Sequence, residues 1–544
     1  MSWNIENQGK WKGKYVYLKN NRREDGGLKT KRIYLGPVNV AVEILGELQT
    51  KPLINEKLKT YSGEAVLGKI ADSIGLKDVL LSCTGNEKES AILRNIIILR
   101  ALFNKSKLGL VERILPYSVF EDKTDIKYID QVYRSMDAVY AHLDDFIYQL
   151  ARNAIKKYKF DLTYLVIDGT GIRIYKDEET GLVKFGYKSE GLPQIKLVLG
   201  VNGQHIPIMG KCYSGSASDV KVFDDVILNL DSKYKSISKK AKKKYVVFDQ
   251  GNVSKENIEH MNNYKDKKIF FVSIVRSGMR EKFIDLVDKS KMELIYDKEI
   301  SKNNHTKIYG NPLKGDVYQK KCSVLVCHNP DIEEQKNNSL NEKIKIVKDK
   351  IAEINKSNKN DASEAVAMIS QYKLKRALKI NGKKNFELIV NDKELEKRRK
   401  YFGFFVLFSN DLTLSSEMIT IYKSRNIIEE GFRELKSDME ITPEYHRRDD
   451  RIETHTVLVV CGYLLLSVLR AIVSSRGNNY SFGELKEIIT SGYLTEGYYE
   501  HKQFGKKKLF IRRPNGFKKE LTNVFSSIKL RMPKIEYNLM PTNF

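Results

Sequence analysis

The pattern between residues 161 and 275 restricts the fold of this chain more than any other feature. Apolar residues there occur in short β-rich runs rather than at helical spacing. The runs are Leu162–Ile167, Ile172–Tyr175, Ile195–Val201, His205–Met209, Tyr245–Phe248 and Lys268–Val275. Asn202-Gly203 is a strong hairpin signal, and Ser218 and Ser254 are suitable starts for two helices. The predicted order is three antiparallel strands, a helix, a strand, a helix and a strand, which indicates a mixed α/β fold.

Two aspartates come directly after β-rich runs. Asp168 follows the first run, and Asp249 follows the run Tyr245–Phe248. The order of elements is the one found in ribonuclease-H-like nucleases, in which these two strands are neighbours. Catalytic groups tend to lie at strand ends in open α/β sheets. We therefore predict a ribonuclease-H-like catalytic core, although either aspartate alone could be a polar strand terminus.

The composition favours an anionic partner, which on charge alone could be DNA, RNA or an anionic membrane. The chain has 95 basic and 69 acidic residues, a net charge of +26. Lys and Arg supply most non-specific affinity for nucleic acid, although a soluble protein with a basic surface would have the same balance. No signal peptide is visible, and Val457–Leu469 is shorter than the roughly 20 residues that span a bilayer. We expect a buried core helix there and a cytoplasmic, nucleoid-associated protein.

Five regions follow from the pattern along the chain. Residues 1–157 hold a predicted N-terminal β-hairpin and a helical region that is a candidate for binding DNA ends. Residues 158–278 and 400–475 hold the two parts of the core, with the long apolar helix in the second. Residues 279–399 form a predicted inserted domain with strands and a helical arm, and residues 476–544 a basic C-terminal region. Packing helices and solvated basic loops would explain the outer regions as well.

The stretch from Tyr422 to Lys436 is the most informative one, and we predict that it lies in one long helix. At about 100° per residue, Tyr422, Arg425, Glu429 and Lys436 fall within about 60° of one another. An apolar stripe beside them can pack against a sheet. The helix thus presents one carboxylate among two cations and a phenol. An ordinary surface helix with an Arg425–Glu429 pair would show the same pattern.

The spacing of these four residues resembles the Tyr, Arg, Glu, Lys pattern of the IS4 group of bacterial insertion-sequence transposases. Other segments that resemble this family are Val166–Thr170, Gly186–Ser189, Gly215–Asp219 and Val246–Asn252. Tyr445–Arg448, Asp450–His455 and Lys31–Gly36 are similar to its IS1634 subgroup in particular. The resemblance spans most of the chain and is strong in the catalytic-core segments.

This resemblance implies a DDE transposase that cleaves DNA and joins strands with a metal-dependent site. Asp168, Asp249 and Glu429 would be the catalytic residues and the ligands of two Mg²⁺ ions, for which Mn²⁺ could substitute. Asp168 would bridge both ions. The partners would be double-stranded DNA, namely the terminal inverted repeats of the transposon and a target, and a second copy of the chain in a synaptic dimer.

The same resemblance assigns DNA contacts. Tyr422, Arg425 and Lys436 would hold backbone phosphates, and Arg425 could also orient Glu429. Further candidates are Arg276, Arg451 and His455. For these last three the alternative is an ordinary residue without a role in DNA binding. A charged residue after a strand is usually solvated, and a lone His beside an apolar helix is usually structural.

Two other functions are compatible with the sequence. An inactive or repurposed transposase would bind DNA without cutting it. A ribonuclease-H-like nuclease would use the same site chemistry and leave cut ends without joining them. The complete set of two aspartates and one glutamate favours the transposase.

Overall fold

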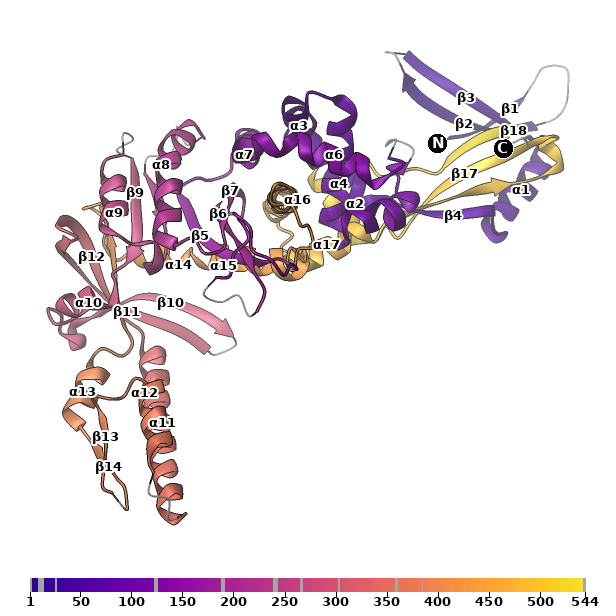
Figure 1. Ribbon diagram of the computed structural model, residues 1–544. Helices are drawn as coiled ribbons and strands as arrows, with labels where there is room; N and C mark the ends of the chain where they lie inside the picture. Colours follow the sequence, from indigo (N-terminus) through magenta and orange to yellow (C-terminus); the bar gives the residue numbers. More distant parts are fainter. Residues whose placement is uncertain are drawn as a thin grey trace. The chain divides into compact units, whose positions relative to one another are not determined.

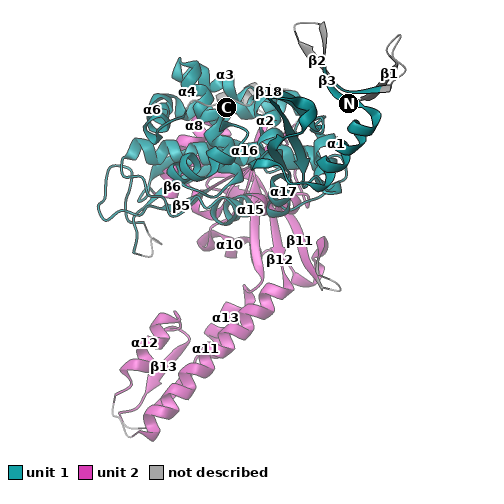
Figure 2. Cartoon of the chain, turned by 90° about the vertical axis from the view of Figure 1, so that its right-hand side faces the viewer, with its two compact units in different colours: residues 1–161, 169–217, 428–544 teal, residues 162–168, 218–427 magenta. Residues whose placement is uncertain are grey.

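The computed structural model describes residues 2–7, 14–24, 27–121, 126–186, 191–237, 243–264, 268–301, 304–357, 361–383 and 385–541. The expected motif Gly186–Ser189 lies, apart from its first residue, outside these ranges. The chain forms two compact units, which Figure 2 shows in different colours. Unit 1 comprises residues 1–161, 169–217 and 428–544, and unit 2 comprises residues 162–168 and 218–427. Both units are built from segments that are far apart in the sequence.

A twisted sheet forms the centre of unit 2 (Figure 1). It is part of a nine-stranded sheet of order β10-β11-β12-β15-β9-β8-β5-β6-β7. The three central strands of the expected core are β5 (Tyr164–Arg173), β8 (Lys244–Val247) and β9 (Ile269–Ile274), all parallel. Every residue of β8 is buried, as expected for a strand covered on both faces. Helices α8 (Asp219–Ile237) and α9 (Lys255–Asn262) alternate with these strands, which confirms the predicted mixed α/β order.

The strand β5 differs from its prediction. We expected it to end at Asp168, with a separate run at Ile172–Tyr175, but β5 continues through Asp168 to Arg173. Gly169 and Gly171 join the two expected runs into one strand. A Cβ at Gly171 would lie 2.3 Å from Gln194 Oε1, so any larger residue here would displace the end of this side chain. Asp168 therefore lies within a strand rather than after one.

The strands of the expected insertion extend the sheet of unit 2. Strand β15 (Phe404–Ser409) pairs with β9 and, on its other edge, with β12 (Lys320–His328), both antiparallel. Strands β11 (Asn304–Val317) and β10 (Glu293–Ser301) follow. Seven consecutive residues of β12, Cys322–His328, are buried, so it is an internal strand. Pairing with β12 covers the edge that β15 would otherwise expose.

Residues 330–400 have a small core of their own. Its elements are α11 (Pro330–Lys356), α12 (Ser363–Gln371), β13 (Leu378–Asn381), β14 (Glu387–Val390) and α13 (Asp392–Lys400). Val347, Ile351 and Ile354 of α11 are buried in this core, together with Ile369 and Phe386. One face of α11 thus packs into this core.

The segment that we predicted as one long helix is interrupted twice. It consists of α14 (Met418–Lys423), α15 (Asn426–Arg433) and a π-helical turn, η7 (Glu434–Asp438). At the first interruption, Arg425 N donates to Tyr422 O at 3.1 Å, and Ser424 Oγ donates to the Ile421 carbonyl at 2.6 Å. Both hydrogen bonds join residues three positions apart, and such bonds tighten the chain and end a regular helix. The even 100° spacing assumed for the motif therefore does not hold along the whole stretch.

A long apolar helix, α16 (Asp449–Ser474), is the core of unit 1. It packs against α2 (Ser62–Ser73), α4 (Glu87–Leu102), α6 (Ile129–Val139) and α7 (Leu143–Tyr158). The antiparallel pair β6 (Gln194–Asn202) and β7 (Pro207–Ser214) also belongs to this unit, and β7 contacts α16. By length and composition α16 could cross a membrane, but 89% of its apolar window is buried inside the protein. The prediction of a core helix over Val457–Leu469 is confirmed.

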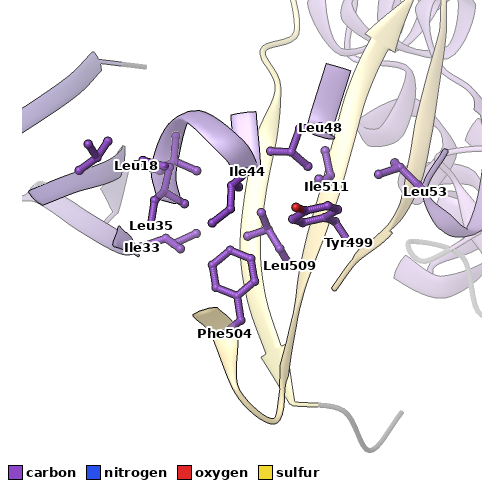
Figure 3. Packing of buried hydrophobic residues seen from close by; sticks show 12 residues of the cluster. Leu18, Ile33, Leu35, Ile44, Leu48, Leu53, Tyr499, Phe504, Leu509 and Ile511 are labelled. Atoms are coloured by element: carbon purple, nitrogen blue, oxygen red, sulfur yellow. The ribbon is translucent and has the colours of Figure 1, made fainter. Parts of the chain in front are cut away.

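The two ends of the chain share a second core within unit 1. Strands β2 (Lys14–Glu24) and β3 (Gly27–Pro37) pair as a hairpin that leads into α1 (Val38–Thr50). β4 (Ile54–Thr60) forms a sheet with β16 (Tyr493–Tyr499), β17 (Lys507–Asn515) and β18 (Glu536–Pro541). Figure 3 shows Leu35 and Ile44 packed with Phe504, Leu509 and Tyr499. The basic C-terminal region is therefore a folded part of unit 1.

Candidate active site

Asp168 lies in β5 and Asp249 lies just after the end of β8, the parallel strand that pairs with β5 in unit 2. The paired residues of β5 and β8 are Tyr164 with Tyr245, Leu165 with Val246, and Val166 with Val247. Asp168 follows Val166 by two residues within β5, and Asp249 follows Val247 by two residues, past the end of β8. Their side chains are 23% and 38% exposed. Two carboxylates are therefore presented together at the surface of the sheet.

Arg425 connects the two aspartates. Its Nη1 lies 3.1 Å from Asp249 Oδ1, and its Nη2 lies 3.9 Å from Asp168 Oδ2. Burial lowers the pKa of Arg425, but the charge of Asp249, the nearby Tyr422 and the charge of Asp168 together raise it above its ordinary value. Tyr422 also forms a hydrogen bond with Arg425. The structure thus brings four of the predicted residues together in unit 2.

The interruption between α14 and α15 explains how the side chain of Arg425 reaches Asp168 and Asp249. Arg425 lies in the turn between the two helices, and α14 packs against β8, β9 and β15. The buried residues Met418, Ile419 and Ile421 anchor α14 on these strands. An amphipathic helix segment was expected, but the turn that places Arg425 was not.

Asp219 is a further acidic residue beside this site that the sequence did not single out as functional. It begins α8, and its Oδ2 would lie 3.3 Å from a Cβ built on Gly251. Gly251 belongs to the short turn after Asp249, so the absence of a side chain allows this close approach. The segment Gly215–Asp219 carries part of the family resemblance, and that was the available signal.

Glu429 and Lys436 belong to unit 1. Glu429 is exposed on α15, and Lys436 is half-buried in the π-helical turn. Burial, with the charge of Arg173, lowers the pKa of Lys436. An anionic ligand stabilises the charged form of a lysine that lies beside another cation. The placement of Glu429 in the catalytic set remains a prediction.

A buried ion pair fixes the turn that follows Glu429. Arg470 Nη1 of α16 lies 2.5 Å from Glu434 Oε1, and the hydroxyl of Tyr463 donates to Glu434 Oε2 at 3.1 Å. The side chains of Arg470 and Glu434 are only 15% and 8% exposed. This pair ties η7 to the core helix of unit 1. Sequence reasoning missed it because its partners are on separate helices.

The three weaker candidates have different surroundings. Arg276 is exposed and precedes α10 (Ser277–Ile284) in unit 2. Arg451 makes two hydrogen bonds of 2.9 Å to Asp137 and lies over the ring of Tyr133. His455 is buried, and its Nε2 lies 2.5 Å from a carboxylate oxygen of Glu444. The contacts of Arg451 and His455 give both a structural role within unit 1, and their contact with DNA stays a prediction.

Comparison with known proteins identifies the family. The model of the transposase DDE domain matches residues 159–465, which is more than half of the chain. The chain belongs to this family. It is a DNA transposase, an enzyme that cleaves DNA and transfers strands, and enzymes of this family use divalent metal ions.

Among solved structures, the chain is similar to piggyBac transposase in a synaptic complex with hairpin DNA, determined by cryo-electron microscopy. The identity is 12%, the TM-score is 0.38, and the match covers 79% of each chain. None of the curated proteins matches the chain.

Proposed function

We propose that this transposase cuts and joins DNA at the terminal inverted repeats of an insertion sequence, with Asp168, Asp249 and Glu429 as its catalytic carboxylates. It would belong to the IS4 type, closest to the IS1634 subgroup, with a ribonuclease-H-like core and a synapse of two chains. The observation that carries the proposal is the pair of aspartates, one in β5 and one just after β8, that Arg425 bridges. The alternation of β5, β8 and β9 with α8 and α9 supports the assignment of the core.

The donor set fits magnesium. Carboxylate oxygens are the ligands that Mg²⁺ prefers, and Asp168 and Asp249 offer them on either side of the Arg425 guanidinium. Glu429, which is exposed on α15, would complete the set, as the family resemblance implies. Two Mg²⁺ ions, or Mn²⁺ in their place, would activate the attacking oxygen and stabilise the leaving oxygen at the phosphorus.

The protein's own cations have a second role at this site. Arg425 balances the charge of Asp249 and Asp168, and its planar fork also matches a phosphate. Tyr422 orients the guanidinium through its hydrogen bond. Lys436, whose pKa is lowered by burial and by Arg173, gains from an anionic neighbour. We assign these three residues to the backbone phosphates next to the cut.

Product analysis tests this function. Purified protein would be incubated with labelled DNA that ends in the repeats flanking its coding frame, together with a supercoiled target and Mg²⁺, Mn²⁺ or chelator. Cut and joined products with either metal, and none with chelator, are expected. Cut ends that are never joined would indicate a nuclease. Binding of the repeats without any product would indicate a DNA-binding protein that has lost its activity.

A further inference from the structure

A pocket of about 450 Å³ lies within unit 1. Its lining residues all belong to this unit, whereas Asp168 and Asp249 belong to unit 2. It is lined by the end of α4, by residues 104–107, by the loop of residues 440–446 and by α16. The volume suits a small group such as a nucleotide. The loop begins four residues after Lys436, the proposed phosphate contact in the same unit.

Two buried cations line this pocket. Arg100 is 7% exposed and Lys107 is 5% exposed. Arg100 Nη2 donates to the Glu440 carbonyl at 3.0 Å, whereas its Nη1 has no hydrogen-bond partner among the described residues. Lys107 Nζ lies 3.1 Å from His446 Nε2. Buried Lys and Arg are almost always paired with an anion. The charge of one buried carboxylate, Glu444, acts on both Arg100 and Lys107, so the two cations share a single buried anion.

The only carboxylate among the lining residues that is buried here is already engaged. Glu444 has one oxygen 2.5 Å from His455 Nε2 and the other 3.7 Å from His446 Nε2. Its backbone is held as well, since Glu444 N donates to the Arg173 carbonyl at 2.9 Å. Within the described part of the chain, no carboxylate oxygen lies at ion-pair distance from Arg100 or Lys107.

A metal ion is the competing occupant, because the donor atoms of Glu444, His446 and His455 lie within 4.8 Å of one another. The ammonium of Lys107, however, already faces His446 Nε2, the atom that would bind the metal. A divalent cation would stand beside this ammonium and near Arg100 in a poorly solvated site, where like charges repel strongly. The charges therefore favour an anion.

We propose that this pocket binds a phosphate group of the DNA backbone between Arg100 and Lys107. This inference rests on the proposed action on DNA and adds a contact outside the catalytic set. Burial, opposed by the charge of Glu444, lowers the pKa of Lys107 to about 7, and a phosphate would favour its charged form. The rings of Tyr133 and Tyr445 also line the pocket and offer apolar faces to the adjoining nucleotide.

The test compares Lys107→Met with Lys157→Met, an exposed lysine of the same unit. Without ligand, Lys107→Met should raise Tm, because it removes a buried cation that has no carboxylate oxygen at ion-pair distance. Sodium phosphate, compared with sodium chloride at equal ionic strength, should stabilise the wild type and Lys157→Met more than Lys107→Met. In anisotropy titrations with repeat-ended duplex, Lys107→Met should bind about tenfold more weakly. The plot of the logarithm of the binding constant against the logarithm of the salt concentration should also become less steep, by about one in its slope.

Several outcomes would overturn the proposal. One is a Lys107→Met protein that responds to phosphate and binds duplex as Lys157→Met does. Loss of the phosphate response with unchanged duplex binding would assign the pocket to free phosphate instead. Saturable binding of Zn²⁺ that His455→Ala abolishes would make it a metal site. If Lys107→Met does not fold, calorimetry of the wild type with inorganic phosphate decides, and no saturable heat would refute the pocket.

Failure of the proposed function is distinguishable from failure of this inference. Asp168→Asn leaves the pocket intact and should bind the duplex like the wild type while cutting none of it. A wild-type protein that does not cut the repeats refutes the proposed function, yet the phosphate response of Lys107 can still be measured.

Discussion

At the residue scale, Arg425 explains how two carboxylates can lie side by side in a folded protein. Its guanidinium lies 3.1 Å from Asp249 and 3.9 Å from Asp168. The sequence placed Arg425 in the site by its spacing from Tyr422 and Glu429. The helical pattern suggested Glu429 as the ion-pair partner of Arg425, because such a pattern relates only residues of the same helix. The contacts with the two aspartates join residues that are far apart in the sequence.

Arg425→Lys should therefore be a damaging change despite the conserved charge. A lysine ammonium is a point charge and cannot hold two carboxylates, or two phosphate oxygens, in a fixed fork. We expect cleavage of repeat-ended DNA to slow by about 10²-fold. The matched control is Arg433→Lys, an exposed arginine of α15. Cleavage by Arg425→Lys at the rate of this control would contradict the role assigned to Arg425.

At the scale of the elements, α16 is tied to its neighbours by two ion pairs that a hydrophobic pattern cannot reveal. Arg470 pairs with Glu434 of η7, and Arg451 pairs with Asp137 of α6. The helix itself could be predicted, since its apolar run is continuous. The π-helical turn and the break at Arg425 could not, because hydrogen bonds such as that from Ser424 to Ile421 compete with the regular helix only locally.

Arg470→Met should destabilise the protein by about 3 kcal/mol at pH 7, because it leaves the buried carboxylate of Glu434 without its cation. The double variant Glu434→Gln with Arg470→Met should recover most of this loss. Urea denaturation of the wild type, both single variants and the double variant gives the coupling. Additive losses would show that the pair does not hold η7 on α16.

The pair of Asp137 and Arg451 should give a pH dependence. Hydrogen bonding to Arg451 lowers the pKa of Asp137 below its ordinary 3.8. The folded state therefore binds this proton less tightly than the unfolded state, so the stabilisation is complete above pH about 4 and is lost as the pH falls through the lower folded value. The difference in Tm between wild type and Asp137→Asn should be largest near neutral pH and shrink below pH 4. A constant difference would contradict this.

At the scale of the whole molecule, the sequence predicts the order of the elements but not all of their neighbours. The apolar runs that form β5, β8 and β9 can be recognised from the local sequence. The structure confirms their alternation with α8 and α9. The pairing of β12 with β15 is not local, because α11, α12, β13, β14 and α13 lie between them. For the same reason, the meeting of Arg100 and Lys107 with the loop at Glu444 had no signal in the sequence.

The assembly of the active protein is a prediction at this scale. A transposase that joins both ends of an element needs two active sites in one complex, so we expect two chains on two repeat-ended duplexes. Mass photometry of the protein with and without this DNA measures the assembly. A single chain on one duplex at all concentrations that support joining would contradict the synaptic dimer.

The central claim is that Glu429 completes the catalytic set of Asp168 and Asp249, and the most direct test compares Glu429→Gln with Glu430→Gln in the joining assay with Mg²⁺. Both glutamates are exposed neighbours on α15, so the two changes are matched in charge and size. The account predicts that Glu429→Gln binds the repeats and yields neither cut nor joined DNA, while Glu430→Gln yields both. Joined products from Glu429→Gln at the level of Glu430→Gln would contradict it.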